Sequence, residues 1–358
     1  MTAMWNLCQN LTQPVTFPAR AALLRRSWPQ FKWLLKKVGD KASITVWTPR
    51  GRDDWEGTSI YDMLYIRNDI DKKFIYYDLP GPRYQEFIKL SVTAGSPLNH
   101  FTLPRRDALL ITWAHRVNSK EALHRAISEN LMFLEADVLL RGQGTANQTD
   151  VPVMAHPPEI DSDITLEEWL QKVATTKQGI KLDFKSAEVL EPAMKILKKM
   201  KHQLQQPVWL NADIFQGPNT DNPGVNATIF KQVILENFPE STLSPGWTTG
   251  WSNSINDTVY TQDMVDKMAN FLQPLQQPVT FPVRAAMLKR SWDILKGLLN
   301  RSRSYTLTVW SSKADNIDVE DLIYVRKDSE IDRIYYDLPE PLNNEFKRRL
   351  GLSLHAIR

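Results

Sequence analysis

Four short apolar runs in the middle of the sequence carry ionisable residues at or near their ends. The runs are Ile111–Arg116, Phe133–Val138, Val151–His156 and Gly179–Lys185. Side chains two positions apart on a β-strand point to the same face, so Glu135 with Asp137, and Lys181 with Asp183 and Lys185, would each form a row that points in one direction. Burying such a row is costly unless the charges are paired, solvated or bound to a metal ion. The spacing therefore indicates a polar pocket formed by successive strands.

The acidic and imidazole side chains of these runs predict a particular chemistry. Glu135, Asp137 and Asp183 would bring three carboxylates together, which is a hard-oxygen site suited to Ca²⁺ or Mg²⁺. His115 and His156 have near-neutral ordinary pKa values and could pass a proton to and from a reacting oxygen. We expect such a set to support metal-assisted cleavage of a phosphodiester.

Basic residues near the same strand ends would hold an anionic group such as a phosphate. Arg116 and Lys185 are the first candidates, and Lys181 shares a strand face with Lys185. Further expected pocket residues come from later strands and comprise Asn211, Asp213, Arg284 and Trp247. Large aromatic residues at strand spacing, such as Trp310 and Tyr336, are instead expected in the core or at its rim.

Each of these residues also has a purely structural interpretation. A histidine at a strand end often makes only a structural hydrogen bond, and a carboxylate facing a lysine often forms an ion pair that fills a barrel interior. The functional interpretation depends on the conjunction of polar residues on four successive strands.

The strands that must position these residues alternate with amphipathic helical stretches. The strand candidates are 110–115, 133–139, 151–156, 180–184, 208–213, 242–247, 279–284, 307–310 and 333–338. The clearest helical patterns are 119–130, 165–175 after a cap-like Asp163, 187–203, 228–236 and 259–272. About eight β-then-α units in roughly 250 residues predict an α/β fold of the (β/α)8 TIM-barrel type, with functional residues at the carboxyl ends of the strands. One of the nine candidates must be an extra strand or loop. A doubly wound open sheet is the second choice, although no Gly-x-Gly-x-x-Gly turn follows the first strand.

Composition restricts the classes of partner and the compartment. The 44 basic and 41 acidic residues give a net charge of only +3 and are interleaved, so a nucleic-acid-binding surface is not expected. No apolar run approaches the length of a membrane span, and the first residues lack the features of a signal peptide. Cys8 is the only cysteine, which excludes an intrachain disulfide. Five N-glycosylation acceptor sites nevertheless favour a secretory origin and begin at Asn10, Asn147, Asn226, Asn256 and Asn300.

An internal repeat determines the expected domain organisation. Gln13–Trp28 recurs as Gln277–Trp292, and three later segments recur in the same order. The spacing between the copies shortens along the chain, so the first copy carries about five extra residues in a loop. The polar strands described above have no counterpart before Gln13. We therefore expect residues 1–92 to be the partial C-terminal half of a first barrel, 93–108 a linker, and 109–358 a complete barrel.

With these motifs in place, the sequence resembles the menorin family (family with sequence similarity 151). The segments that carry the resemblance are Leu134–Leu140, Met154–Glu159, Gly179–Ser186, Asn211–Ile214, Gly246–Trp251 and the two Gln-Pro-Val-Thr-Phe-Pro repeats. The two-copy arrangement is similar to the larger, type A members, which carry two such domains and are membrane-anchored and face the extracellular side. The resemblance implies that this chain is a short form that lacks the anchor and most of the first domain.

More distantly, the strand motifs resemble those of glycerophosphodiester phosphodiesterases and other phospholipase-C-like barrels. The pair His115-Arg116 matches the His-Arg of the first strand in that pattern, and the Glu-x-Asp metal ligands match Glu135 and Asp137. His156 matches the second catalytic histidine. The resemblance implies a phosphodiester or lipid-like small molecule as the substrate.

The Glu-x-Lys motif of the fourth strand in those enzymes corresponds to Asp183 and Lys185, so this carboxylate is one methylene shorter here. Val117 replaces a glycine and Pro157 replaces an aspartate of the pattern. Two functions follow as hypotheses. One is metal-dependent phosphodiester cleavage, and the alternative is a non-catalytic extracellular adhesion or ligand-binding protein that retains the pocket.

Overall fold

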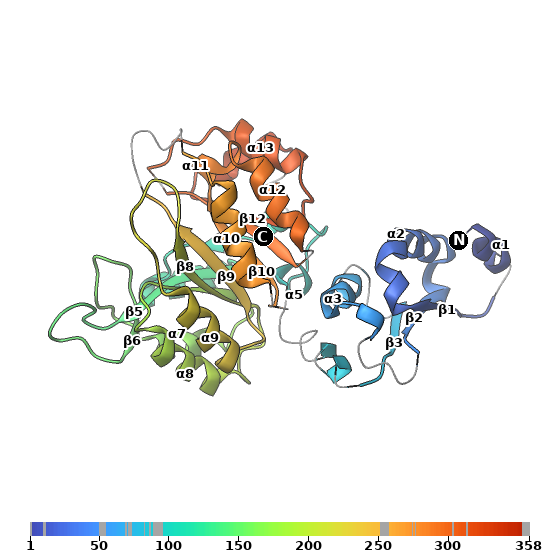
Figure 1. The fold of residues 1–358 in the computed structure, drawn as a ribbon, viewed down its shortest axis with the longest axis horizontal. Helices are drawn as coiled ribbons and strands as arrows, with labels where there is room; N and C mark the ends of the chain where they lie inside the picture. The colour runs from blue at the N-terminus through green and yellow to red at the C-terminus, as the bar shows by residue number, and fades with distance from the viewer. Residues whose placement is uncertain are drawn as a thin grey trace. The chain divides into compact units, whose positions relative to one another are not determined.

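The computed structural model describes residues 2–9, 12–49, 55–68, 70, 74–81, 83–85, 87–88, 96–250, 258–273, 275, 277–302, 304–312 and 314–352, and the structural account concerns these residues. The chain divides into two compact units, Met1–Val92 and Thr93–Arg358. Figure 1 shows both units, and each is described by itself.

Unit 2 (Thr93–Arg358) is built on eight parallel strands that neighbour one another in the order of the sequence. They are β4 (Trp113–Ala114), β5 (Phe133–Leu140), β7 (Gly179–Phe184), β8 (Val208–Gln216), β9 (Thr242–Thr248), β10 (Val279–Arg284), β11 (Tyr305–Trp310) and β12 (Ile334–Asp337). A doubly wound sheet would reverse its strand order part-way, whereas this order runs unbroken from β4 to β12. The strands form a nearly closed barrel, and the predicted fold class is confirmed.

The ninth strand of the sheet is the extra run that the sequence predicted. β6 (Pro152–Met154) pairs antiparallel with β5, with Leu140 opposite Pro152 and Val138 opposite Met154. The candidate at 151–156 is therefore a hairpin arm and not a barrel strand. The first candidate, 110–115, was also too long, because a 3-10 turn, η4 (Ala108–Leu110), takes up its beginning.

Helices follow the barrel strands and bury their apolar faces against the outside of the sheet (Figure 1). The helices of unit 2 are α5 (Pro97–His100), α6 (Lys120–Ser128), α7 (Leu166–Val173), α8 (Leu190–Met200), α9 (Ala227–Asn237), α10 (Gln262–Leu272), α11 (Ala285–Leu288), α12 (Trp292–Arg301), α13 (Val319–Lys327) and α14 (Leu342–Arg349). Side-chain caps fix several starts. Thr165 forms a capping box with Glu168 at α7, while the expected cap Asp163 instead accepts a hydrogen bond from the Lys120 amide.

The inside of the barrel is closed at its floor by aromatic rings. Trp113, Phe133 and Trp209 are in mutual ring contact, with centroids 4.6 to 5.6 Å apart. Tyr335 extends this layer at 5.0 Å from Trp209. A Cβ on Gly179 would lie 2.3 Å from the Phe133 ring, so glycine makes room for this layer on β7. The aromatic layer thus closes the barrel at the end opposite to the carboxyl ends of its strands.

The segment expected to be a linker packs beneath this floor. Leu98 and Ala108 are buried in the same cluster as the aromatic rings. The Ala108 amide donates to the Ile331 carbonyl at 2.9 Å, which joins the segment before β4 to the segment before β12. The fully buried Asp107 binds Arg326 at 2.6 Å. These contacts bring together the two ends of the sheet, and part of the region 93–108 is integral to unit 2.

Unit 1 (Met1–Val92) contains a three-stranded parallel sheet in the order β1-β2-β3. Its elements are α1 (Thr2–Cys8), β1 (Val15–Arg20), α2 (Ala21–Val38), η1 (Gly39–Lys41), β2 (Ala42–Trp47), η2 (Trp55–Gly57), α3 (Ile60–Asn68) and β3 (Ile75–Asp78). One face of this sheet packs against the apolar side of α2, and the side chains buried there are Phe17, Ala19, Ile44 and Val46.

Candidate functional site

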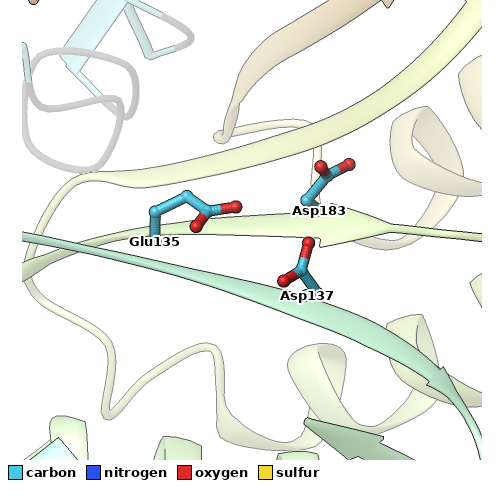
Figure 2. Close-up of side chains that lie close together, drawn as sticks. All are labelled: Glu135, Asp137 and Asp183. Atoms are coloured by element: carbon cyan, nitrogen blue, oxygen red, sulfur yellow. The ribbon is translucent and has the colours of Figure 1, made fainter. Parts of the chain in front are cut away.

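Three carboxylates from two adjacent strands meet inside the barrel at its carboxyl end. Glu135 and Asp137 alternate along β5, and Asp183 lies directly opposite Asp137 on β7. One oxygen from each carboxylate lies within 4.8 Å of the others, and Figure 2 shows that the three side chains lie close together. Glu135 and Asp137 are 2% exposed. The predicted acidic trio is thus brought together, and its spacing and hard oxygen ligands could hold a metal ion.

Lys185 neutralises part of this charge. Its Nζ lies 2.8 Å from Asp137 and 2.5 Å from Asp183. Burial disfavours the lysine ammonium, but the two carboxylates outweigh that cost and raise its pKa above the ordinary value. Burial likewise opposes ionisation of Asp183, but Lys185, Lys181 and the hydrogen bond from Asn211 together outweigh it, so the pKa of Asp183 lies below its ordinary value.

No lysine of the described residues lies at hydrogen-bond distance from Glu135. Its Oε2 accepts from the Arg116 amide at 2.8 Å, at a backbone position with φ of 57°. Burial raises the pKa of Glu135, and the neighbouring Asp137 adds to the effect. This carboxylate would therefore gain most from a cation placed beside it.

Neutral side chains fix the orientation of the other two carboxylates. Asn118 donates to Asp137 Oδ2 at 2.8 Å and accepts from the Asp137 amide at 2.9 Å. Asn211 donates to Asp183 Oδ1 at 2.7 Å, and the Ser244 hydroxyl donates to the Asn211 side-chain oxygen at 2.6 Å. The predicted residue Asn211 therefore positions a carboxylate. The sequence analysis missed Asn118 and Ser244, and only the strand register could have found them.

His115 is held by a carboxylate that the sequence analysis also missed. Its Nδ1 lies 2.8 Å from Asp337 at the end of β12 and 3.4 Å from Glu135. Burial opposes the charged imidazole, but Asp337 and Glu135 outweigh it and raise the pKa of His115 to about 10. The sequence did contain a signal for Asp337, because the Tyr-Tyr-Asp-Leu-Pro segment that includes it occurs in both copies of the repeat.

Asp213 and Lys181 lie near this cluster without direct partners. Among the described residues, neither side chain forms a hydrogen bond or an ion pair, although Lys181 is only 4% exposed. A Cβ on Gly246 would lie 2.2 Å from Asp213 Oδ1, which shows how closely β9 approaches the carboxylate. Burial, with a contribution from Asp183, raises the pKa of Asp213 to about 7.

The formal charges of the mouth favour a divalent cation. The carboxylates are Glu135, Asp137, Asp183, Asp213 and Asp337. Lys181, Lys185 and a protonated His115 supply three positive charges against these five, and the exposed Arg116 side chain adds a fourth. An excess of carboxylates remains, and neighbouring carboxylates add to the effect of burial in raising the pKa values of Glu135 and Asp213. The residues present therefore fit a divalent metal ion.

The other predicted site residues lie in different surroundings. His156 follows the hairpin strand β6, and among the described residues its Nδ1 lies 2.5 Å from the Pro157 carbonyl oxygen. The Arg116 side chain is exposed at the mouth. His156 thus lies on a loop and not, as expected, at the end of a barrel strand.

Arg284 and Trp247 require correction. The Arg284 guanidinium forms a two-bond fork with Asp315, at 2.9 and 2.5 Å, and lies over the Trp310 ring, so its charge is already compensated. Trp247 is buried against Tyr260 and Phe281 in the layer between strands and helices. Side chains alternate along β9, and because Ser244 points inward, Trp247 points outward. It is a packing residue and does not line the mouth.

Comparisons with known proteins identify the family. The family model described as the Menorin N-terminal domain matches residues 1–84 and 107–343. The chain belongs to the menorin family. Human protein FAM151B is 43% identical over 258 residues, which cover 72% of this chain and 93% of the relative.

Two solved structures are more remote. One, assigned as a glycerophosphoryl diester phosphodiesterase from Silicibacter pomeroyi DSS-3, gives a TM-score of 0.41 at 13% identity and covers 74% of this chain and 98% of that chain. A dihydropteroate synthetase gives a TM-score of 0.26 at 11% identity and covers 66% of this chain and 89% of that chain. The barrel of unit 2 is therefore assigned from the strand order of this chain and not from these two structures.

Proposed function

We propose that this menorin-family chain is a metal-dependent phosphodiesterase whose reaction takes place at the mouth of the unit 2 barrel. The observation that carries the proposal is the convergence of Glu135, Asp137 and Asp183 within 4.8 Å in a mouth with an excess of carboxylates. A bound Ca²⁺ or Mg²⁺ would polarise a phosphoryl oxygen and stabilise the charge that develops on it.

The proton transfers are assigned to the two histidines. Asp337 engages Nδ1 of His115, which leaves Nε2 as the nitrogen that exchanges a proton with the substrate. A pKa of about 10 keeps His115 protonated at neutral pH, so it would act as the general acid toward the leaving oxygen. His156, on its loop after β6, would act as the base.

The phosphate group would be held by cations at the mouth. Lys185 is anchored by Asp137 and Asp183. The backbone amide of Arg116 donates to Glu135, which places the exposed Arg116 side chain at the mouth. Lys181 has no direct partner among the described residues and would bind an anionic oxygen deeper in the barrel.

Hydrolysis of a panel of glycerophosphodiesters and lysophospholipids tests this function. We expect turnover of at least one compound in the presence of Ca²⁺ or Mg²⁺, and a loss of roughly 100-fold or more in His115→Gln because a general acid is removed. His124→Gln, an exposed histidine on α6, is the matched control and should retain activity. Equal activity of His115→Gln and the unaltered chain would exclude the assigned role.

A non-catalytic ligand-binding or adhesion role is the second candidate, and one observation favours it. Lys185 already bridges Asp137 and Asp183, as it would in a purely structural ion-pair cluster. Under this alternative the panel is not cleaved with either metal, while Lys185→Met strongly destabilises the fold.

A secretory route remains part of the proposal. Asn147, Asn226 and Asn300 are exposed, although Asn300 lies in α12 and not in a loop, and Asn10 and Asn256 fall outside the described residues. Among the described residues, no helix combines the length and apolar composition needed to cross a bilayer. Removal of N-linked glycans from protein made in animal cells should reduce its apparent mass.

A further inference from the structure

An open groove of about 850 Å³ lies in the helical layer of unit 2. Its walls come from α7, α8 and α9, which neighbour one another in chain order (Figure 1), and from the loop that leads into β6. None of the three carboxylates of the acidic trio lines this groove. Its volume lies within the range of pockets that bind ligands. The groove is therefore a candidate binding surface separate from the mouth.

Two apolar stripes line the groove. Pro192 and Ile196 lie four residues apart on α8 and so share one side of that helix, and Ile229 and Val233 repeat this spacing on α9. Other side chains of these helices are fully buried in the core, namely Leu190, Ala193, Met194, Leu197 and Met200 on α8 and Phe230 and Ile234 on α9. Each helix thus presents a second apolar stripe, and both stripes face the same groove.

Ile229 shows that this apolar surface is open to solvent. Among the described residues of unit 2, the exposed large apolar side chains are Ile229 at 41%, Ile331 at 39% and Tyr324 at 50%. Ile331 lies in the turn before β12, and the Lys289 ammonium lies over the Tyr324 ring. Ile229 instead borders a groove with further apolar walls. A contiguous exposed apolar surface is typical of an interaction site.

Carboxylates line the same groove and determine its charge. Glu167 pairs with Lys199 at 2.7 Å, and Glu191 pairs with Lys195 at 3.4 Å. Asp150 and Glu188 are exposed, and among the described residues neither forms a hydrogen bond or an ion pair. The groove therefore keeps two uncompensated negative charges in a chain whose net charge is +3. Charge complementarity favours a cationic partner.

The shape of the groove suits a helix better than an extended strand. The nearest strand, β6, pairs with β5 on one side, and its Val153 forms a bridge with Thr165 on the other, so both of its edges are occupied. Two neighbouring helices with facing apolar stripes form a surface on which a third helix packs. A helix with a diameter of about 10 Å fills roughly 850 Å³ over about two turns, which matches the volume of the groove.

We propose that this groove binds an amphipathic helix of another protein, in which an apolar face of Leu or Ile is flanked by Lys and Arg. The apolar face would contact Ile229 and Ile196, and the basic residues would pair with Asp150 and Glu188. An anionic membrane surface is a poorer match, because the same carboxylates would repel it. The inference is independent of whether the mouth of the barrel is catalytic.

Fluorescence anisotropy of a labelled amphipathic peptide, built from repeats of Leu-Lys-Lys-Leu, tests the proposal on the intact chain. We expect saturable binding that Ile229→Asn weakens at least about tenfold, because an apolar contact is lost. Ile331→Asn is the matched control, since Ile331 is exposed to nearly the same extent, and it should leave binding unchanged. Absence of binding, or equal binding by the Ile229→Asn chain, would overturn the proposal.

Charge reversal tests the electrostatic part of the proposal. Glu188→Lys should weaken binding of the peptide, whereas Glu121→Lys, which reverses an exposed charge on α6, should not. A peptide with Glu in place of every Lys should bind at least about tenfold more weakly than the basic peptide. Equal binding of the two peptides would overturn the cationic assignment.

Photo-crosslinking identifies where the peptide binds. A peptide with a photoreactive group on its apolar face should crosslink to α8, α9 or the loop before β6, as mapped by mass spectrometry. Crosslinks confined to unit 1 or to the mouth would overturn the proposal. Dimers of the unaltered chain that Ile229→Asn dissociates would assign the groove to a second copy of this chain and would also overturn it.

Discussion

At the level of single residues, the account depends on carboxylates whose environments differ within a few ångströms. Asp183 is held ionised by Lys185, whereas burial works against ionisation of Glu135 and Asp213. The sequence could predict the trio, because residues two apart on a strand share a face. It could not predict that Asp337, more than 200 residues beyond His115, would bind that histidine, because this contact exists only once the barrel closes.

The partnership of His115 with Asp337 predicts a measurable change in titration. Asp337→Asn should lower the pKa of the imidazole from about 10 by roughly one to two units, because a nearby negative charge is removed. Imidazole proton shifts followed by NMR against pH would measure it. Asp161→Asn, which removes an exposed carboxylate paired with Arg141, should have no effect. A pKa near 6.5 for His115 in the unaltered chain would refute the assignment.

Asp213 predicts a dependence of stability on pH in the metal-free protein. Its pKa is raised from 3.8 to about 7 in the folded chain, so folding loses stability as the pH rises through this interval. Asp213→Asn should therefore stabilise the protein by an amount that grows with pH up to neutrality, on the order of 1–3 kcal/mol at pH 8.

Denaturant unfolding at pH 4.5 and pH 8 with a chelator present would measure the effect of Asp213→Asn. Asp150→Asn, on an exposed loop, serves as the control and should change stability equally at both pH values. A gain from Asp213→Asn that is the same at pH 4.5 and pH 8 would contradict the raised pKa.

At the level of elements, the alternation of strands and helices was sufficient to predict the barrel but not the exact role of each strand. Val151–His156 has the composition of a parallel strand, and its antiparallel pairing with β5 depends on the turn that precedes it. The prediction that Trp247 lines the pocket failed because the sequence does not show which residues of β9 face inward, and this depends on the register with β8. Composition predicts a strand more readily than it predicts which face of that strand is inside.

The packing of the barrel floor predicts a specific intolerance on β7. Gly179→Ala would place a Cβ 2.3 Å from the Phe133 ring, so one side chain or the strand must shift, at a cost of roughly 1–3 kcal/mol. Gly297→Ala in α12 is the control. Apart from its chain neighbours and the backbone of its own helix, no heavy atom of the described residues would lie within 4 Å of a Cβ added here. The change should be neutral or stabilising by up to about 1 kcal/mol. Thermal unfolding of both variants would decide, and equal melting temperatures would contradict the packing.

At the level of the whole molecule, the two units differ in how completely their sheets are covered. The repeat in the sequence predicts a partial unit followed by a complete one. Among the described residues, Tyr76 on β3 is 57% exposed, whereas its counterpart in the repeat, Tyr335 on β12, is 3% exposed. The sequence alone could not show that residues before β4 would close the barrel floor, because their apolar residues are few and irregularly spaced.

The difference in coverage predicts the order in which the chain is degraded. Limited proteolysis should digest Met1–Val92 first and leave a stable product close to Thr93–Arg358, because local opening is easier where fewer residues are buried. Mass spectrometry of the surviving fragments would identify the boundary. Early cleavage within the barrel, with unit 1 intact, would contradict this expectation.

The central claim is that neighbouring strands of unit 2 create a site for one divalent cation. Titration calorimetry of the intact, chelator-treated chain with Ca²⁺ and with Mg²⁺ tests it most directly. We predict one bound ion per chain for at least one of the two metals, with affinity lost in Asp183→Asn and retained in Asp161→Asn, whose carboxylate is 62% exposed and remote from the trio in the sequence. No binding of either metal, or binding that Asp183→Asn leaves unchanged, would contradict the account.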